Sequence, residues 1–150
     1  MPVTVGIDLG TTNSVVAYID SNGNPQVLTN EEGFRTTPSV VSFSDQEILV
    51  GLSAVDNESE NPAETIRSVK RNMGKSHIYL LHNKEYSPEQ ISSYILTKLK
   101  KDAETFIGDT IDSAVITVPA YFNNDQRKST KVAAELAGLR VSRIINEPTA

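Results

Sequence analysis

The feature that most constrains this chain is the stretch Val3 to Ser14, which reads VTVGIDLGTTNS. Its odd-numbered residues up to position 9 are apolar and alternate with polar or small ones, the period-two pattern of a β-strand. One carboxylate, Asp8, lies between two glycines on the other face, which leaves space for a ligand to approach the strand. A turn at residues 10–13 and an apolar run at residues 14–19 then predict a returning strand.

The turn consists of Gly10, Thr11, Thr12 and Asn13. A turn of this composition offers backbone N–H groups and hydroxyl donors, which suit a phosphate group. Asp8 stands beside these donors and suits a hydrated Mg²⁺ ion. An ordinary hairpin connection is the alternative reading of a Gly-Thr-Thr turn. The residues of the turn alone therefore leave both a phosphate site and a plain turn open.

The composition is that of a single globular domain. The chain has 150 residues, a net charge of −5 and no cysteine. The negative charge argues against a nucleic-acid surface, and the lack of thiols excludes disulfides and thiolate metal sites. We expect no signal peptide and no transmembrane segment, and hence a cytoplasmic protein that binds neither nucleic acid nor membrane.

The rest of the chain carries clear turn signals and helix ends. The predicted elements are short strands at residues 26–29, 38–43 and 47–50, helices at 61–74, 87–108 and 123–138, and longer strands at 113–118 and 141–146. Each predicted helix begins with a capping residue and ends at a glycine. The two longer strands flank a helix, and such a strand–helix–strand unit predicts a right-handed crossover with parallel pairing.

Four stretches together resemble one protein family. They are GIDLGTTNS at residues 6–14, VKR at 69–71, AVITVPAYF at 114–122 and RIINEPTA at 143–150. The chain is similar to the first lobe of the ATPase domain of Hsp70 (DnaK-type) chaperones, over its whole length. This resemblance implies an α/β, actin-like ATPase (ribonuclease-H-like) lobe with a mixed five-stranded sheet, flanking helices and a small inserted α+β subdomain. The lobe would span residues 1–150, with its core at about 1–35 and 87–150 and the insertion at about 36–86.

The resemblance also implies the roles of the residues in the first turn and strand. Asp8 is expected to bind the metal or one of its waters. Gly10, Thr11, Thr12 and Asn13 are expected to contact the β- and γ-phosphates of ATP or ADP. The implied cations are Mg²⁺ and, in addition, K⁺.

Two further residues are candidates for catalysis. By resemblance, Lys70 is expected to reach the γ-phosphate or the attacking water as a point charge. From the residue alone, an exposed surface lysine at the end of the predicted helix is the alternative. Glu147 is expected to orient the attacking water, because it ends a buried strand. Without the family motif, Glu147 reads as a helix-entry residue.

The resemblance implies regulatory residues and partners as well. Pro119 and Arg127 match positions that relay the nucleotide state to a substrate domain, although Pro119 by itself is simply the end of a strand. Arg143 matches a position that contacts a J-domain co-chaperone. The implied partners are ATP, unfolded polypeptides bound through a substrate domain absent from this chain, a J-domain co-chaperone and a nucleotide exchange factor. We expect this chain alone to be inactive in ATP hydrolysis.

Three other functions compete with this interpretation. A sugar kinase of the same superfamily shares the Asp-x-Gly-Thr turn, but the stretches VITVPAYF and NEPTA argue against it. A ribonuclease-H-type nuclease needs several converging carboxylates, whereas the strand at 113–118 ends at Pro119. A non-catalytic binding piece is the third possibility.

Asn124, Val132 and Ala134 depart from the usual family pattern, which puts co-chaperone coupling in doubt more than phosphate contact.

Overall fold

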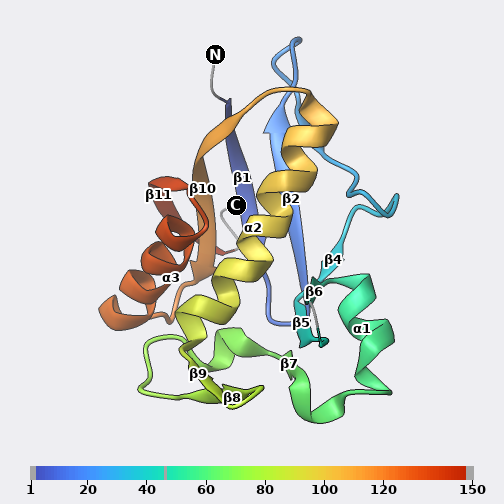
Figure 1. Cartoon of the computed structure of the whole chain (residues 1–150). Helices are drawn as coiled ribbons and strands as arrows, with labels where there is room; N and C mark the ends of the chain where they lie inside the picture. The colour runs from blue at the N-terminus through green and yellow to red at the C-terminus, as the bar shows by residue number, and fades with distance from the viewer. Residues whose placement is uncertain (1–2, 46, 148–150) are drawn as a thin grey trace.

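A six-stranded mixed sheet forms the centre of the structure, a computed structural model that describes residues 3–45 and 47–147 (Figure 1). The strands lie in the order β11-β10-β1-β2-β3, and β4 pairs with β2. Their bounds are Val3–Leu9 (β1), Asn13–Ile19 (β2), Pro25–Val27 (β3), Thr37–Pro38 (β4), Ile111–Pro119 (β10) and Arg140–Glu147 (β11). The pairs β1–β2 and β2–β3 are antiparallel and the pair β10–β11 is parallel, as the sequence predicts. Strand β1 also pairs with β10 in parallel.

Strand β1 presents its apolar residues to one face of the sheet and Asp8 to the other. Val5, Ile7 and Leu9 are buried, whereas Gly6 is half-buried and Asp8 is exposed. Because successive side chains of a strand point to opposite faces, the sheet has one face packed on the core and one open face at this point. The alternation read from the sequence is therefore confirmed.

The three parallel strands end at the same edge of the sheet. Asp8 of β1 lies opposite Thr117 of β10, and Pro119 of β10 lies opposite Glu147 of β11. In open α/β sheets, ligands bind in the crevice outside the carboxyl ends of the strands. This edge brings together side chains from three segments that are far apart in the sequence.

Two long helices pack side by side on the buried face of the sheet (Figure 1). They are α2 (Pro88–Ile107) and α3 (Asn124–Leu136), close to the predicted bounds. Both begin with a capping box, in which Ser87 caps α2 and Asn123 caps α3. The capping residues seen in the sequence therefore fix where both helices start.

A smaller group of elements lies between β3 and α2 in the chain. It contains a second sheet with the strand order β6-β5-β7 and a two-stranded hairpin. Its elements are β5 (Val40–Phe43), β6 (Ile48–Val50), α1 (Leu52–Glu58), the 3-10 helices η1 (Pro62–Glu64) and η2 (Val69–Asn72), β7 (Thr65–Arg67), β8 (Tyr79–Leu81) and β9 (Lys84–Tyr86). The buried ring of Phe43 lies 5.0 Å from that of Tyr86 and 6.0 Å from that of Tyr94, centroid to centroid, which joins this group to α2.

The predicted helix at residues 61–74 is wrong. Its first residue makes no side-chain capping bond, and helical backbone is limited to two short 3-10 segments. Thr65 and Ile66 instead pair with β5, an environment that favours β-branched residues. Ser68 then adopts a left-handed backbone conformation at φ 57°, which interrupts any helix before Lys70.

Two smaller predictions also differ from the structure. The sheet has six strands rather than five, because the strand predicted at 38–43 is divided: Pro38 joins Thr37 in β4, which pairs with β2, and β5 begins at Val40. The sequence pattern does not predict α1, a 7-residue helix whose start at Gly51 has no side-chain capping bond. Within residues 3–45 and 47–147, no helix combines the length and the apolar character needed to cross a membrane.

Candidate functional site

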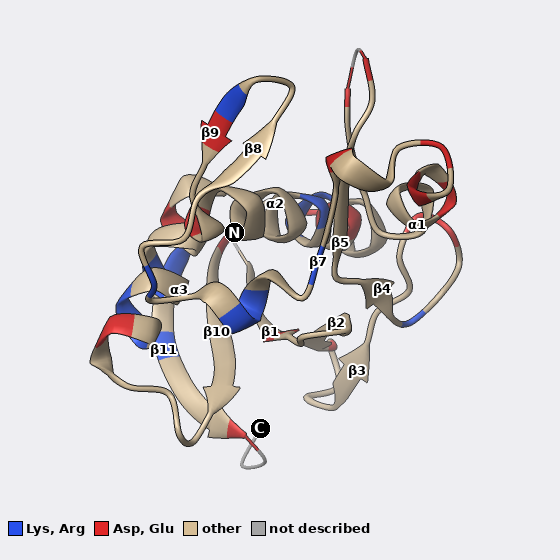
Figure 2. Cartoon of the chain, turned by 90° about the horizontal axis from the view of Figure 1, so that it is seen from below, with Lys and Arg blue, Asp and Glu red and all other residues tan. Residues whose placement is uncertain are grey.

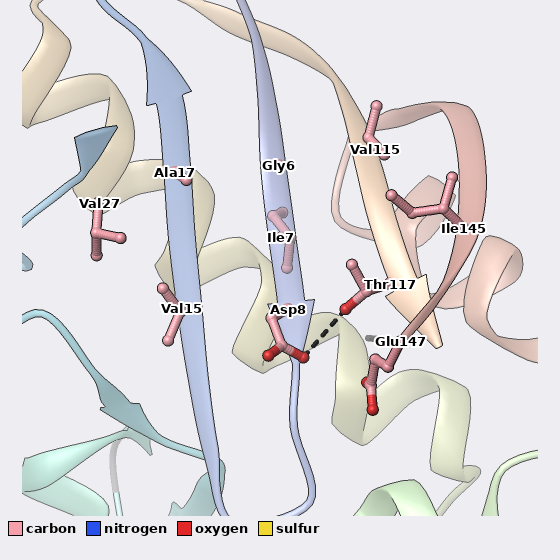
Figure 3. A pocket seen from close by; sticks show the side chains of 10 residues that line it. All are labelled: Gly6, Ile7, Asp8, Val15, Ala17, Val27, Val115, Thr117, Ile145 and Glu147. Atoms are coloured by element: carbon pink, nitrogen blue, oxygen red, sulfur yellow. Dashed lines mark hydrogen bonds between the residues drawn. The ribbon is translucent and has the colours of Figure 1, made fainter. Parts of the chain in front are cut away.

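An open cavity of about 600 Å³ lies on the sheet face that α2 and α3 leave uncovered (Figure 3). It is lined by Gly6, Ile7, Asp8, Val15, Ala17, Val27, Val115, Thr117, Ile145 and Glu147. The wall is apolar along the strands, and its two carboxylates, Asp8 and Glu147, stand where β1 and β11 end. The cavity therefore becomes polar only at the edge where the parallel strands finish.

Asp8 is held from one side by the neighbouring strand. The hydroxyl group of Thr117 donates a hydrogen bond of 3.1 Å to Oδ1 of Asp8 (Figure 3), and the Asp8 side chain is otherwise exposed. In the part of the chain that the structure describes, no three His, Cys, Asp or Glu side chains gather as a metal site. A single exposed carboxylate fits Mg²⁺, which keeps several waters and takes further ligands from phosphates.

Residues Gly10–Asn13 form a tight turn at the carboxyl end of β1. A Cβ atom at Gly10 would collide with the carbonyl oxygen of Asn13, so the turn requires glycine at this position. Thr12 and Asn13 are exposed, and Thr11 is half-buried. The turn thus leaves its polar side chains accessible next to Asp8.

Lys70 is buried and forms an ion pair with Glu147. Its Nζ lies 3.2 Å from Oε1 of Glu147, and only 9% of the Lys70 side-chain surface is exposed. The same Nζ lies 5.8 Å from the centroid of the Phe122 ring, within the range of a cation–π contact. The alternative of an exposed surface lysine at a helix end is therefore wrong, because η2 carries Lys70 inward.

Pro119 and Arg127 both lie next to the end of β11. Pro119 is buried and stands opposite Glu147 in the β10–β11 pairing. The Arg127 guanidinium donates through Nη2 to Oδ1 of Asn146 at 2.7 Å, and through Nε to the carbonyl oxygen of Phe122 at 3.1 Å. The contacts of Arg127 join α3 to the segment after β10 and to the end of β11.

The sequence matches a known family over nearly its whole length. The family model described as Hsp70 protein matches residues 4–150. The chain belongs to the Hsp70 family. The mixed α/β sheet described above agrees with that membership.

Relatives of this Hsp70 chain include three chaperone proteins named DnaK. That of Mycoplasmopsis agalactiae is 59% identical over 148 residues, which cover 99% of this chain and 24% of the relative. That of Thermotoga neapolitana is 56% identical over 147 residues, which cover 97% of this chain and 25% of the relative. That of Halobacterium salinarum is 52% identical over 147 residues, which cover 97% of this chain and 23% of the relative. The chain therefore spans about a quarter of the length of these relatives.

Arg143 of the Hsp70 chain lies apart from the cavity that contains Asp8. It is exposed on β11, the edge strand of the sheet, and borders a separate hollow of about 490 Å³ with Arg127 and residues 144–146. Figure 2 shows Lys and Arg residues, in blue, gathered on α3 and β11. The predicted site residues thus fall into a group at the sheet edge and Arg143 on β11, and Arg127 borders the hollow beside Arg143.

Four residues that support this Hsp70 site are missed by sequence reasoning. They are Ser39, Thr117, Phe122 and Asn146. Thr117 could be found from the sequence. It lies two residues before Pro119, so the side chains of both residues point to the same face of the strand. The contacts of Ser39, Phe122 and Asn146 depend on segments that are distant in the sequence, and no local sequence pattern predicts them.

The three departures from the usual Hsp70 pattern all lie on α3, outside the lining of the large cavity. Asn124 and Val132 are exposed, whereas Ala134 is completely buried. Exposed residues alter the surface that a helix presents to a partner, and a buried alanine alters only packing. The first two positions therefore concern the outer surface of α3 and not the sheet edge.

Proposed function

We propose that this chain is the first lobe of the ATPase domain of a DnaK-type Hsp70 chaperone, in which ATP hydrolysis drives a protein-folding cycle. The observation that carries the proposal is the ion pair of the buried Lys70 with Glu147, at the same sheet edge as Asp8. Identities of 59% and 52% to DnaK proteins over nearly the whole chain support it. A sugar kinase is not favoured, because the match of residues 4–150 is to the Hsp70 family.

The proposed lobe has an actin-like, ribonuclease-H-like architecture. Its core consists of about residues 1–35 and 87–150, and residues of about 36–86 form an inserted subdomain. Two features of the structure support this division. The large sheet with α2 and α3 contains the first and last strands of the chain, and the second sheet lies in the segment between β3 and α2.

The turn and Asp8 are proposed to bind the phosphates and their cation. The backbone N–H groups and side chains of Gly10–Asn13 hold the β- and γ-phosphates of ATP. Asp8 holds a hydrated Mg²⁺ ion, which when bound neutralises charge on the phosphates. The hydrogen bond from Thr117 fixes the orientation of the Asp8 carboxylate before the ion arrives.

Lys70 and Glu147 are proposed to act on the transferred phosphoryl group. Hydrolysis breaks the bond between the γ-phosphorus and the leaving oxygen of ADP while water attacks from the opposite side. The ammonium group of Lys70 stabilises the charge on the γ-phosphoryl oxygens in the transition state. Glu147 accepts a hydrogen bond from the attacking water and orients it. Their mutual contact of 3.2 Å holds both groups at the sheet edge.

The remaining assignments concern coupling and partners. Pro119 and Arg127 are proposed to relay the nucleotide state to a peptide-binding domain, and Arg143 to contact a J-domain co-chaperone. We also propose a nucleotide exchange factor as a partner and K⁺ as a second bound cation. The proposed location of the protein is the cytoplasm. The contacts of Arg127 with the segment beside Glu147 support the relay, because they link α3 directly to the proposed catalytic edge.

A chimera tests the proposed function. This chain would replace the aligned 24% of the DnaK of Mycoplasmopsis agalactiae, and ATP hydrolysis would be measured under single-turnover conditions. We expect a rate within about tenfold of that of the parent, because each proposed group is present in the replaced segment. A folded chimera that binds ATP but does not hydrolyse it would show that this chain lacks the catalytic groups assigned to it.

A further inference from the structure

Ser39 lies directly behind the turn Gly10–Asn13 and binds it through two hydrogen bonds. Its backbone N–H donates to the carbonyl oxygen of Thr12 at 2.9 Å, and its hydroxyl group donates to that of Gly10 at 2.8 Å. Its Oγ also lies 2.8 Å from Oγ of Ser14. Ser39 is 2% exposed and Ser14 is 0% exposed, so water does not replace these bonds when one is lost.

The direction of the bond between the two serines follows from counting protons. A serine hydroxyl has one proton to donate and two lone pairs to accept with. Because the Ser39 proton goes to Gly10, the hydroxyl of Ser14 must donate to Oγ of Ser39. The result is a directed chain from Ser14 through Ser39 to the backbone of the turn, in which each hydroxyl is satisfied.

These bonds determine which way the amide groups of the turn point. In a trans peptide, the carbonyl oxygen and the N–H of the next residue lie on opposite sides of the chain. Since the carbonyls of Gly10 and Thr12 face Ser39, the N–H groups of Thr11 and Asn13 point away from it. The two donors are thereby held on the side of the turn opposite to Ser39, where an anion can approach.

We propose that Ser39 is a positioning residue that fixes the turn with its N–H donors directed toward a phosphate. This inference rests on the proposed function, in which Gly10–Asn13 binds the phosphates of ATP. It adds a contact from outside the turn, because Ser39 joins β4, which pairs with β2, to the buried strand β5. Ser39 therefore links the second sheet to the turn: its buried side chain and its backbone N–H make the orientation of the turn depend on where the second sheet lies.

Ser42 provides a matched control in the adjoining strand. It is 0% exposed, its Oγ lies 2.7 Å from Oγ1 of Thr65, and it accepts a bond of 2.8 Å from Asn57. Ser42→Ala therefore removes a buried, hydrogen-bonded hydroxyl group just as Ser39→Ala does, with a comparable loss of stability. Only Ser39→Ala removes a hydrogen bond to the turn, that from the hydroxyl group to Gly10, while the backbone N–H bond to Thr12 remains.

The first test measures the order of the turn in the nucleotide-free 150-residue chain. Backbone ¹⁵N relaxation should give order parameters of about 0.85 for Thr11 and Asn13 in the wild type. In Ser39→Ala the value for Thr11 should fall below about 0.6, whereas Asn13 should stay more ordered because the backbone bond from residue 39 to Thr12 remains. Ser42→Ala should match the wild type. A wild-type turn that is already mobile, or an equally rigid turn in Ser39→Ala, would overturn the proposal. Should Ser39→Ala not fold, Ser14→Ala serves instead, with an order parameter expected between those two values.

The second test measures anion binding, with inorganic triphosphate and Mg²⁺ titrated while the amide resonances of the turn are followed. We expect the affinity to fall about tenfold in Ser39→Ala and to be unchanged in Ser42→Ala. Equal affinity in wild type and Ser39→Ala would overturn the positioning role. If wild type binds no triphosphate at the turn, the phosphate-binding role proposed for Gly10–Asn13 fails, while the relaxation data still decide whether Ser39 holds the turn.

Discussion

Nζ of Lys70 and Oε1 of Glu147 lie 3.2 Å apart, although 77 residues separate them in the sequence. Lys70 reaches this position from η2, and Glu147 from the end of β11. Removal of a charged group from water is costly unless a partner compensates, and the Glu147 carboxylate compensates the charge of Lys70. We assign this pair to the phosphoryl transfer proposed above.

We predict that Lys70→Ala in the DnaK chimera reduces single-turnover hydrolysis by about a hundredfold or more, while ATP binding changes little. The reason is that its charge acts on the γ-phosphoryl oxygens in the transition state and not on the nucleoside. Lys75→Ala removes an exposed lysine five residues away and should leave the rate unchanged. Hydrolysis by Lys70→Ala within about threefold of the unmutated chimera would contradict the catalytic role of Lys70.

Arg127→Ala is predicted to separate ATP hydrolysis from peptide release in the same chimera. Basal hydrolysis should change by less than about threefold, because Arg127 bonds Asn146 and Phe122 and not the proposed reacting groups. ATP-triggered release of a fluorescent peptide should slow, because the link between α3 and the end of β11 is lost. Lys128→Ala, on an exposed position of α3, is the control. Normal peptide release in Arg127→Ala would count against the relay.

The parts of the fold that were predictable are those with local signals. Ser87 and Asn123 form the capping bonds that their spacing to Gln90 and Gln126 predicts, so α2 and α3 begin as expected. The alternation of apolar and polar or small residues around Asp8 likewise predicts that one face of β1 is open. The parallel pairing of β10 and β11 was predictable too, but the place of β1 beside β10, which brings Asp8 to the same edge as Glu147, has no local signal.

The parts that were not predictable depend on contacts between distant segments. The helix predicted at residues 61–74 has plausible ends, but Thr65 and Ile66 gain more by pairing with β5, more than 20 residues earlier. The burial of Lys70 beside Phe122 and the contact of Ser39 with the turn are of the same kind. Local propensity is a weak prior that tertiary contacts override.

Gly74→Ala is predicted to destabilise the chain by about 3 kcal/mol in urea unfolding. Gly74 has a φ of +79°, and an added Cβ would lie 3.0 Å from the backbone nitrogen of Gln126 in α3. The control is Gly23→Ala, at a φ of +82° with no atom within 4 Å of the added Cβ, which should cost only about 1 kcal/mol. Equal losses in the two variants would show that the close approach to α3 is unimportant.

Lys98 forms a second buried ion pair, which gives a prediction about stability. Its Nζ lies 2.9 Å from Oδ2 of Asp102 and 3.0 Å from Oε1 of Glu32, and the Asp102 side chain is only 4% exposed. Lys98→Met should destabilise the chain by about 3 kcal/mol, because it leaves the Asp102 carboxylate buried without its partner. The double variant Lys98→Met/Asp102→Leu should recover much of this loss. Failure of the double variant to recover would point to packing rather than charge.

The same pair gives a prediction about pH. Burial by itself lowers the pKa of Lys98, but the hydrogen bonds and charges of Asp102 and Glu32 outweigh burial, so the pKa lies above its ordinary value. A raised pKa in the folded state means that the stability from this group is fully present below the unfolded pKa of about 10.4. It is lost as pH rises through the higher folded value.

Lys98→Arg isolates this effect, because arginine stays charged throughout the range. The difference in unfolding free energy between wild type and Lys98→Arg should be constant from pH 7 to about pH 9.5. Above about pH 10.4, wild type should lose stability relative to Lys98→Arg, since only the lysine gives up its proton. Urea unfolding at a series of pH values measures both curves on the same protein background, so that titration of the tyrosines cancels. Parallel curves up to pH 11.5 would mean that the charge of Lys98 contributes nothing to the folded state.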